Sequence, residues 1–126
     1  MSSAIAIIPA RGGSKRIKGK NIKLFCGKPI IAYSIELALE SNLFERVIVS
    51  TDSKEIADIA LDYGAEVPFF RSAENADDFA TIYDVIKEVH SNLEKTYTFT
   101  CCIFSTAPLL QLKTLNAGRL YCILLL

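Results

Sequence analysis

The chain has 126 residues, of which 51% are hydrophobic, so it suits one packed domain and is not a disordered chain. Lysine and arginine balance the acidic residues at 14 each, so no net charge draws the chain to nucleic acid or to an anionic membrane. The charges are unevenly placed, because every acidic residue lies at or after Glu36 while half of the basic residues lie in 11–28. A neutral chain therefore carries one concentrated cationic segment near its N-terminus.

The four cysteines favour a reduced, cytoplasmic compartment. None belongs to a C-x-x-C pair, and the single histidine, His90, has no cysteine near it, so we expect neither a zinc site nor a disulfide framework. Cys101 and Cys102 lie in an apolar run and are expected in the core. No charged leader precedes the apolar stretch 4–8, and the apolar tail 121–126 is far shorter than the ~20 residues of a membrane span. We expect no membrane partner.

The first half of the chain alternates strand and helix patterns. Residues 4–8 form a continuous apolar run that ends at Pro9, which is typical of a strand buried on both faces of a parallel sheet. After a loop rich in glycine and lysine, Pro29 is expected to open a helix whose apolar stripe continues to Ala38. Residues 46–51 predict a second buried strand.

The alternation continues in the second half. Asp52 is expected to cap the next helix, with Glu55 completing a capping-box-like pair and Gly64 ending the helix. Three more elements are expected: a short strand over 66–70, the clearest helix over 81–95 and an apolar strand over 97–104.

The order β-α-β-α-β-α-β predicts an α/β fold, a three-layer sandwich with a mainly parallel, Rossmann-like sheet and right-handed crossovers. In such sheets ligands bind beyond the carboxyl ends of the strands, near the point where the strand order reverses. The first predicted strand ends directly in the cationic segment. Architecture and charge therefore indicate the same place for a site.

The residue types of the cationic segment suit a polyphosphate site. Gly12 and Gly13 allow a tight turn that presents bare N–H groups, Arg11 offers a planar fork, and Lys15 and Lys20 offer point charges. The segment fits neither the P-loop pattern nor the dinucleotide pattern G-x-G-x-x-G. A solvated basic loop is the alternative, but the place of the loop after an apolar strand favours an anion site.

Residues 7–16, IIPARGGSKR, followed by Lys20-Asn21 and by GKPII over 27–31, resemble the signature of the sugar-acid cytidylyltransferases. These enzymes make CMP-sialic, CMP-legionaminic and CMP-pseudaminic acid. The resemblance covers about residues 4–112, and it continues through four further blocks: 47–52, 63–68, 71–78 and 101–110. The last block is most similar to the pseudaminic acid branch. The resemblance implies a fold like that of the nucleotide-diphospho-sugar transferases.

The resemblance also implies a reaction and the residues for it. The anomeric hydroxyl of a nine-carbon 2-keto sugar acid attacks the α-phosphate of CTP, Mg²⁺ assists, and pyrophosphate leaves. The residues so implied are, for the triphosphate, Arg11, Gly12, Gly13, Ser14, Lys15 and Lys20, the two lysines being catalytic; for the nucleotide, Asn21 and Arg71; and for the sugar acid, Phe104 and Thr106. A homodimer is implied for the full-length family.

Several of these residues also have a plainer structural interpretation. Arg71 is alternatively a surface ion-pair partner of Glu74 or Asp78, and Phe104 is alternatively a core residue. Asp52 is alternatively an N-cap only. Helix-start and solvated-face positions are the alternative for the remaining acids, Asp77, Asp78 and Asp84. His90 is expected to be a partly exposed helix residue with no catalytic role.

The chain departs from the family pattern in two ways. Lys18 stands where the motif often has a proline, and the chain is shorter than members of the family. We therefore expect a nucleotide-binding part over 1–118 with a sheet incomplete at the C-terminus, an aberrant apolar tail over 119–126, and metal carboxylates beyond residue 126. Weak CTP binding and poor turnover are then expected.

Three alternative functions stay open at this point. One is a cytidylyltransferase for the eight-carbon sugar acid of lipopolysaccharide. Another is a catalytically dead CTP-binding fragment, or a chain that only pairs with an intact copy. A nucleic-acid-binding protein is suggested only by the basic loop, and the chain lacks the spread of positive charge that such proteins show.

Overall fold

The computed structural model describes residues 3–12, 20–72, 81–104 and 122–124, with the backbone alone for Lys20 and residues 122–124. The elements in chain order are β1 (Ala4–Pro9), the 3-10 helix η1 (Lys20–Ile22), β2 (Leu24–Phe25), β3 (Lys28–Pro29), α1 (Ile30–Ser41), β4 (Arg46–Ser50), α2 (Lys54–Asp62), α3 (Ile82–Ser91), β5 (Phe99–Cys102) and β6 (Cys122–Leu124).

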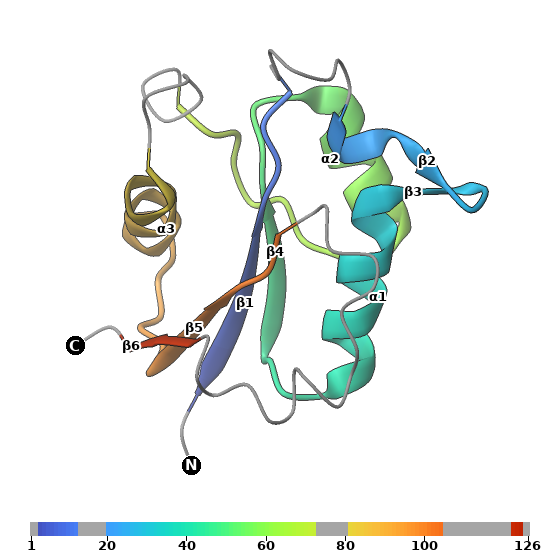
Figure 1. The fold of residues 1–126 in the computed structure, drawn as a ribbon. Coiled ribbons are helices and arrows are strands. Elements are labelled where there is room, and N and C mark those ends of the chain that lie inside the picture. The colour runs from blue at the N-terminus through green and yellow to red at the C-terminus, as the bar shows by residue number, and fades with distance from the viewer. Residues whose placement is uncertain (1–2, 13–19, 73–80, 105–121, 125–126) are drawn as a thin grey trace.

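The main sheet has the strand order β4-β1-β5-β6. β1 is parallel to both of its neighbours, and its residue Ile7 lies opposite Ile48 of β4 and Cys102 of β5. β6 runs antiparallel to β5, so part of the tail 119–126 joins the sheet edge, although its description as an aberrant tail stays a prediction. Helices α1 and α2 cover one face and α3 covers the other (Figure 1). The predicted three-layer α/β fold with a mainly parallel sheet is confirmed.

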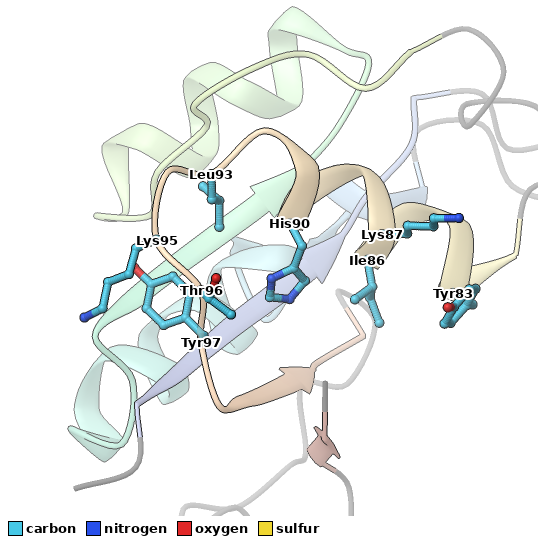
Figure 2. A pocket seen from close by; sticks show the side chains of 8 residues that line it. All are labelled: Tyr83, Ile86, Lys87, His90, Leu93, Lys95, Thr96 and Tyr97. Atoms are coloured by element: carbon cyan, nitrogen blue, oxygen red, sulfur yellow. The ribbon is translucent and has the colours of Figure 1, made fainter. Parts of the chain in front are cut away.

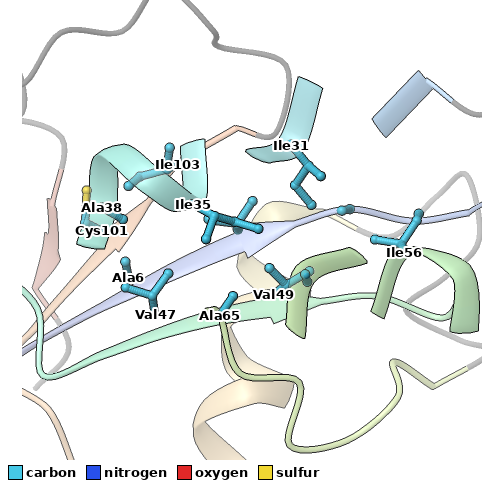
Figure 3. Close-up of a cluster of buried hydrophobic side chains, with 13 residues drawn as sticks. Ala6, Ile31, Ile35, Ala38, Val47, Val49, Ile56, Ala65, Cys101 and Ile103 are labelled. Carbon is cyan, nitrogen blue, oxygen red and sulfur yellow. The ribbon is translucent and has the colours of Figure 1, made fainter. Parts of the chain in front are cut away.

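The central strand β1 explains why the sequence begins with an unbroken apolar run. Successive side chains of a strand point to opposite faces, so Ala6 and Ile8 enter the core under α1 and α2. That core, which also contains Ile35 of α1, is drawn in Figure 3. Ile5 and Ile7 enter the second core, under α3. Each fully buried isoleucine contributes about 1.5–3 kcal/mol to the stability of the fold. Because side chains from both faces of β1 are buried, the strand needs apolar residues at successive positions.

Helix starts follow their local sequence. Thr81 and Asp84 form a reciprocal capping box at α3, with backbone N–H to side-chain oxygen distances of 3.1 and 3.0 Å. Pro29, expected in the first turn of the helix, is instead the N-cap of α1, with φ −52°, one residue before the first turn begins at Ile30. The prediction that Asp52 caps α2 is wrong. Ser53 is the N-cap, because it is the extended residue whose Oγ accepts from the N–H of Ile56 at 3.4 Å.

Three predicted elements are shorter in the structure. The strand expected over 66–70 is a single parallel bridge between Glu66 and Ile48, because exposed Pro68 has no N–H to continue a ladder. The helix expected over 81–95 ends at Ser91. The strand expected over 97–104 is reduced to β5.

The sequence interpretation missed the hairpin β2-β3. Its two-residue turn, Cys26-Gly27, has φ values of 51° and 81°, and two positive values are what a type I′ hairpin turn requires. Glycine supplies one of them without strain. This hairpin leads the chain from the cationic segment into α1.

Among the described residues, no helix combines the length and the apolar character that a bilayer crossing needs.

Candidate functional site

The carboxyl ends of β4, β1 and β5 lie at one edge of the sheet because the three strands are parallel. The N–H of Ala10, just after β1, donates to the carbonyl oxygen of Ser50 at 2.9 Å, and the N–H of Ile103 donates to the carbonyl oxygen of Ile7 at 3.0 Å. The strand order reverses at β1, since the next strand of the main sheet, β4, lies on one side of it and β5 lies on the other. This edge is therefore the expected place for a ligand.

The start of the cationic segment is fastened to the end of β4. The N–H of Gly12 donates to Oδ1 of Asp52 at 2.7 Å. A Cβ at Gly12 would lie 2.9 Å from the Cβ of Ser53, a distance that real Cβ contacts do not reach. Gly12 is therefore required here by close approach, and Asp52, expected as a helix cap, holds the loop instead.

Arg71 lies beneath the same strand end. Its side chain is 7% exposed, Nη2 donates to the carbonyl oxygen of Ser50 at 2.7 Å, and Nε donates to Ser50 Oγ at 3.2 Å. Its own N–H donates to the carbonyl oxygen of Thr51 at 2.8 Å. Arg71 is therefore not a surface residue, while its alternative partners, Glu74 and Asp78, lie outside the described residues.

Four charged groups surround this strand end. Burial lowers the pKa of Arg71, the carboxylates of Asp52 and Glu88 raise that pKa, and the positive charge of Arg11 lowers it. The guanidinium stays charged at neutral pH, since arginine is the most basic side chain and its pKa is lowered from far above neutrality. Two arginine charges thus act on one another at the edge where the cationic segment starts.

A brace from α3 positions the segment that carries Arg71. Glu88 accepts from the N–H of Ser72 at 2.9 Å with one carboxylate oxygen and from Ser72 Oγ at 2.5 Å with the other. The sequence interpretation missed this pair. No local pattern indicates it, because Ser72 and Glu88 are 16 residues apart and Glu88 is an ordinary polar-face residue of its helix.

Asn21 is buried and its amide nitrogen donates to the carbonyl oxygen of Arg11 at 2.8 Å. The structure therefore gives this side chain a place in holding the loop, and contact with a nucleotide stays a prediction. Lys20 is the first residue of η1. Four predicted site residues lie outside the described residues: Gly13, Ser14, Lys15 and Thr106.

Phe104 follows β5 at the same edge, and its ring is 58% exposed. The alternative of a core residue is therefore wrong. Its carbonyl oxygen accepts from Ser34 Oγ of α1 at 2.8 Å, which holds the backbone while the ring faces solvent. Its contact with a sugar acid stays a prediction.

The described residues contain no group of three histidine, cysteine or carboxylate side chains that could hold a metal ion. They do not make up a Mg²⁺ site by themselves.

Of the two adjacent cysteines, Cys101 is buried as expected, while Cys102 is half-buried. Burial raises the pKa of the Cys102 thiol to about 11, so it is protonated at neutral pH.

A hollow of about 260 Å³ lies between α3 and the segment that enters β5, apart from the strand-end site (Figure 2). His90 is half-buried, as expected, and its Nε2 lies 2.7 Å from Oγ1 of buried Thr100. Burial lowers the pKa of His90. Residues 93–97 precede β5, so the hollow adjoins the amino end of that strand, away from the edge that carries Arg71.

Comparison with known proteins finds relatives that match most of this chain. The chain is 49% identical over 110 residues to a pseudaminic acid cytidylyltransferase of Campylobacter jejuni, covering 85% of this chain and 47% of that protein. It is 44% identical over 107 residues to a CMP-N,N'-diacetyllegionaminic acid synthase of Legionella pneumophila, covering 85% of this chain and 44% of that protein. The chain thus spans about half the length of the curated relatives it matches.

The solved structures agree with the fold. CMP:2-keto-3-deoxy-manno-octonic acid synthetase, solved with CTP, matches with a TM-score of 0.79 and 25% identity over 92% of this chain and 45% of that one. A 4-diphosphocytidyl-2C-methyl-D-erythritol synthase from Anaerococcus prevotii, at 20% identity and a TM-score of 0.65, covering 94% of this chain and 52% of that one, shares the fold. A family model described as "Cytidylyltransferase" matches residues 5–118. The chain therefore belongs to the cytidylyltransferase family.

Proposed function

We propose that this chain provides the nucleotide-binding part of an enzyme that transfers CMP from CTP to a nine-carbon 2-keto sugar acid, with release of pyrophosphate. The observation that carries the proposal is the place where the cationic segment begins: the carboxyl edge of the sheet at which the strand order reverses, with its first residues held by Asp52 and Asn21. Arg11 follows β1 at this edge and Arg71 lies beneath it, so positive charge gathers where an anionic ligand would bind.

The roles follow from what this chemistry needs. Transfer at a phosphate requires positioning and neutralisation of negative charge more than covalent help. Arg11, Lys15 and Lys20 hold the triphosphate, with the backbone around Gly12 and Gly13 and the Ser14 hydroxyl, and the two lysines neutralise the charge on the reacting and leaving phosphates. Arg71 and Asn21 contact the nucleotide. Phe104 and Thr106 face the sugar acid.

Mg²⁺ belongs to the proposal as the metal that accompanies the triphosphate and offsets its charge. Because the described residues do not gather a ligand set for it, we assign it no ligand and derive no step through it. A homodimer and a cytoplasmic location are likewise part of the proposal. Light scattering of the purified chain tests the homodimer. The mass of a single chain in solution contradicts it.

Pseudaminic, legionaminic and sialic acids are the proposed substrates, with pseudaminic acid first. Sequence identity of 49% to a pseudaminic acid cytidylyltransferase supports this choice. The eight-carbon sugar acid is the second candidate, favoured by the TM-score of 0.79 to the octonic acid synthetase. Identity to that protein is 25%, so the nine-carbon class is the better supported.

The binding part is tested by calorimetric titration of the chain with CTP, UTP and ATP. Arg11→Ala and Lys20→Ala are expected to weaken CTP binding by about tenfold or more, since each removes a charge-assisted contact. Lys54→Ala is the matched control. Lys54 is exposed at the start of α2, and its replacement removes one positive charge, as the two loop variants do. Equal binding of all three nucleotides, or no loss in the two loop variants, contradicts the site.

The reaction is tested by pyrophosphate release from CTP with Mg²⁺ and each sugar acid. Release with pseudaminic acid and less with the eight-carbon acid supports the first choice, and the reverse order supports the second candidate. Preferential CTP binding without release from any sugar acid supports the alternative of a CTP-binding fragment.

A further inference from the structure

We propose that Asp52 is a positioning residue of the triphosphate site, which holds the N–H of Gly12 and so fixes the start of the cationic segment at the end of the sheet. This inference rests on the proposed function and deepens it. It assigns to Asp52 no contact with the substrate, because its carboxylate is already used by the protein backbone.

Three successive residues after β1 are each held by a different part of the chain. The N–H of Ala10 donates to Ser50 of β4 at 2.9 Å, the carbonyl of Arg11 accepts from Asn21 of η1 at 2.8 Å, and the N–H of Gly12 donates to Asp52 at 2.7 Å. Asp52 makes the last of these contacts before the rest of the cationic segment. Residues 10 to 12, where the segment begins, are therefore fixed by contacts from three other parts of the chain.

The contact at Gly12 is short, as is typical of a hydrogen bond to a carboxylate. It is also supported from two sides. The missing side chain of Gly12 lets the backbone close on Ser53, and the carboxylate of Asp52 lies within electrostatic reach of Arg71. The first feature lets the backbone of Gly12 approach Asp52, and the second is a favourable charge interaction for the carboxylate that receives the N–H.

A carboxylate beside a polyphosphate site carries a cost, because it repels the ligand. Two consequences therefore oppose one another. If Asp52 positions the loop, removing its acceptor atom weakens CTP binding. If Asp52 merely occupies an N–H that a phosphate oxygen would take, removing it strengthens binding. Substitution by asparagine separates the effects, since the amide keeps an acceptor oxygen at the same place and loses the charge.

The experiment compares Asp52→Asn and Asp52→Ala with the wild-type chain and with Asp58→Ala. Asp58 is exposed on α2, so its replacement makes the same charge change away from the loop. Two quantities are measured: the hydrogen-exchange rate of the Gly12 amide by NMR, and the dissociation constant for CTP by calorimetry. Asp52→Ser, whose side chain is one bond shorter, replaces the alanine variant if that variant does not fold.

The alanine variant is expected to speed Gly12 exchange by about tenfold and to weaken CTP binding by about tenfold, as loss of a charge-assisted hydrogen bond implies. Asp52→Asn and Asp58→Ala are expected within about threefold of wild type in both measurements, because one keeps the acceptor and the other lies elsewhere. Unchanged Gly12 exchange in the alanine variant, or CTP binding that tightens equally in Asp52→Ala and Asp52→Asn, overturns the proposal. If the wild-type chain does not bind CTP, the proposed function fails, and the Gly12 exchange rates alone decide whether Asp52 positions the loop.

Discussion

Replacement of Arg71 by lysine tests whether this side chain is a structural part of the strand-end site. The guanidinium makes two hydrogen bonds to Ser50, at 2.7 and 3.2 Å, from a position that is 7% exposed. Lysine keeps the charge but loses the planar fork, so it retains one of these contacts at most. A hydrogen bond to a charged group contributes about 1.5–3 kcal/mol. The carbonyl of Ser50 keeps its bond from Ala10, so it does not become unpaired.

We therefore expect Arg71→Lys to lower the free energy of unfolding by about 2 kcal/mol, which for a chain of this size lowers the melting temperature by roughly 6–10 °C. The matched control is Arg46→Lys. Arg46 makes two contacts of 3.0 Å to Glu66, but the two side chains are 28% and 48% exposed, so solvent weakens the pair and a loss of less than about 0.5 kcal/mol is expected.

Urea titration followed by circular dichroism measures both variants, and tyrosine fluorescence gives a second signal because the chain has no tryptophan. A change below about 0.5 kcal/mol in Arg71→Lys, or an equal loss in Arg46→Lys, would refute the reasoning that burial at the strand end makes this arginine structural.

Three further predictions concern single sites. Gly12→Ala is expected to cost about 1–2 kcal/mol of unfolding free energy in urea titration, because its Cβ would lie 2.9 Å from that of Ser53; a neutral effect contradicts the close approach. Burial lowers the pKa of His90 from 6.5, so the unfolded chain binds more protons and stability falls as pH drops below that value, down to the lowered pKa. In His90→Asn this part of the pH dependence should disappear from urea midpoints, and its persistence would assign it to other groups. Burial raises the pKa of Cys102 to about 11 while Cys26 is exposed, so mass spectrometry after brief alkylation should find Cys26 modified first; prior modification of Cys102 contradicts its burial.

Patterns with a fixed period were predictable from the sequence. The unbroken apolar run of β1 indicated a strand buried on both faces, and the structure places Ile7 in one core and Ile8 in the other. Thr81, three residues before Asp84, begins α3 with a capping box. Such features depend on residues within one or two turns, so the local sequence contains all the information they need.

Where a cap and a loop contact compete for one side chain, the local sequence does not decide between them. Asp52 and Ser53 both suit an N-cap, and the structure uses Ser53 for the helix because Gly12 claims the carboxylate of Asp52. The local sequence also does not decide the burial of Arg71, because that burial depends on the end of β4, 21 residues earlier. An exposed ion pair was an equally good interpretation until that strand end was placed beside it.

By itself, the sequence determined the alternation of strands and helices, the cationic segment after the first strand, and the family to which its motifs belong. Only the tertiary structure decided what holds that segment: Asp52 on Gly12, Asn21 on Arg11, and Glu88 on the residue next to Arg71. Periodic burial depends on the residue types at neighbouring positions, so the local sequence predicts it. Contacts between strand ends exist only after residues 10 to 40 positions apart have been brought together by the folding of the sheet.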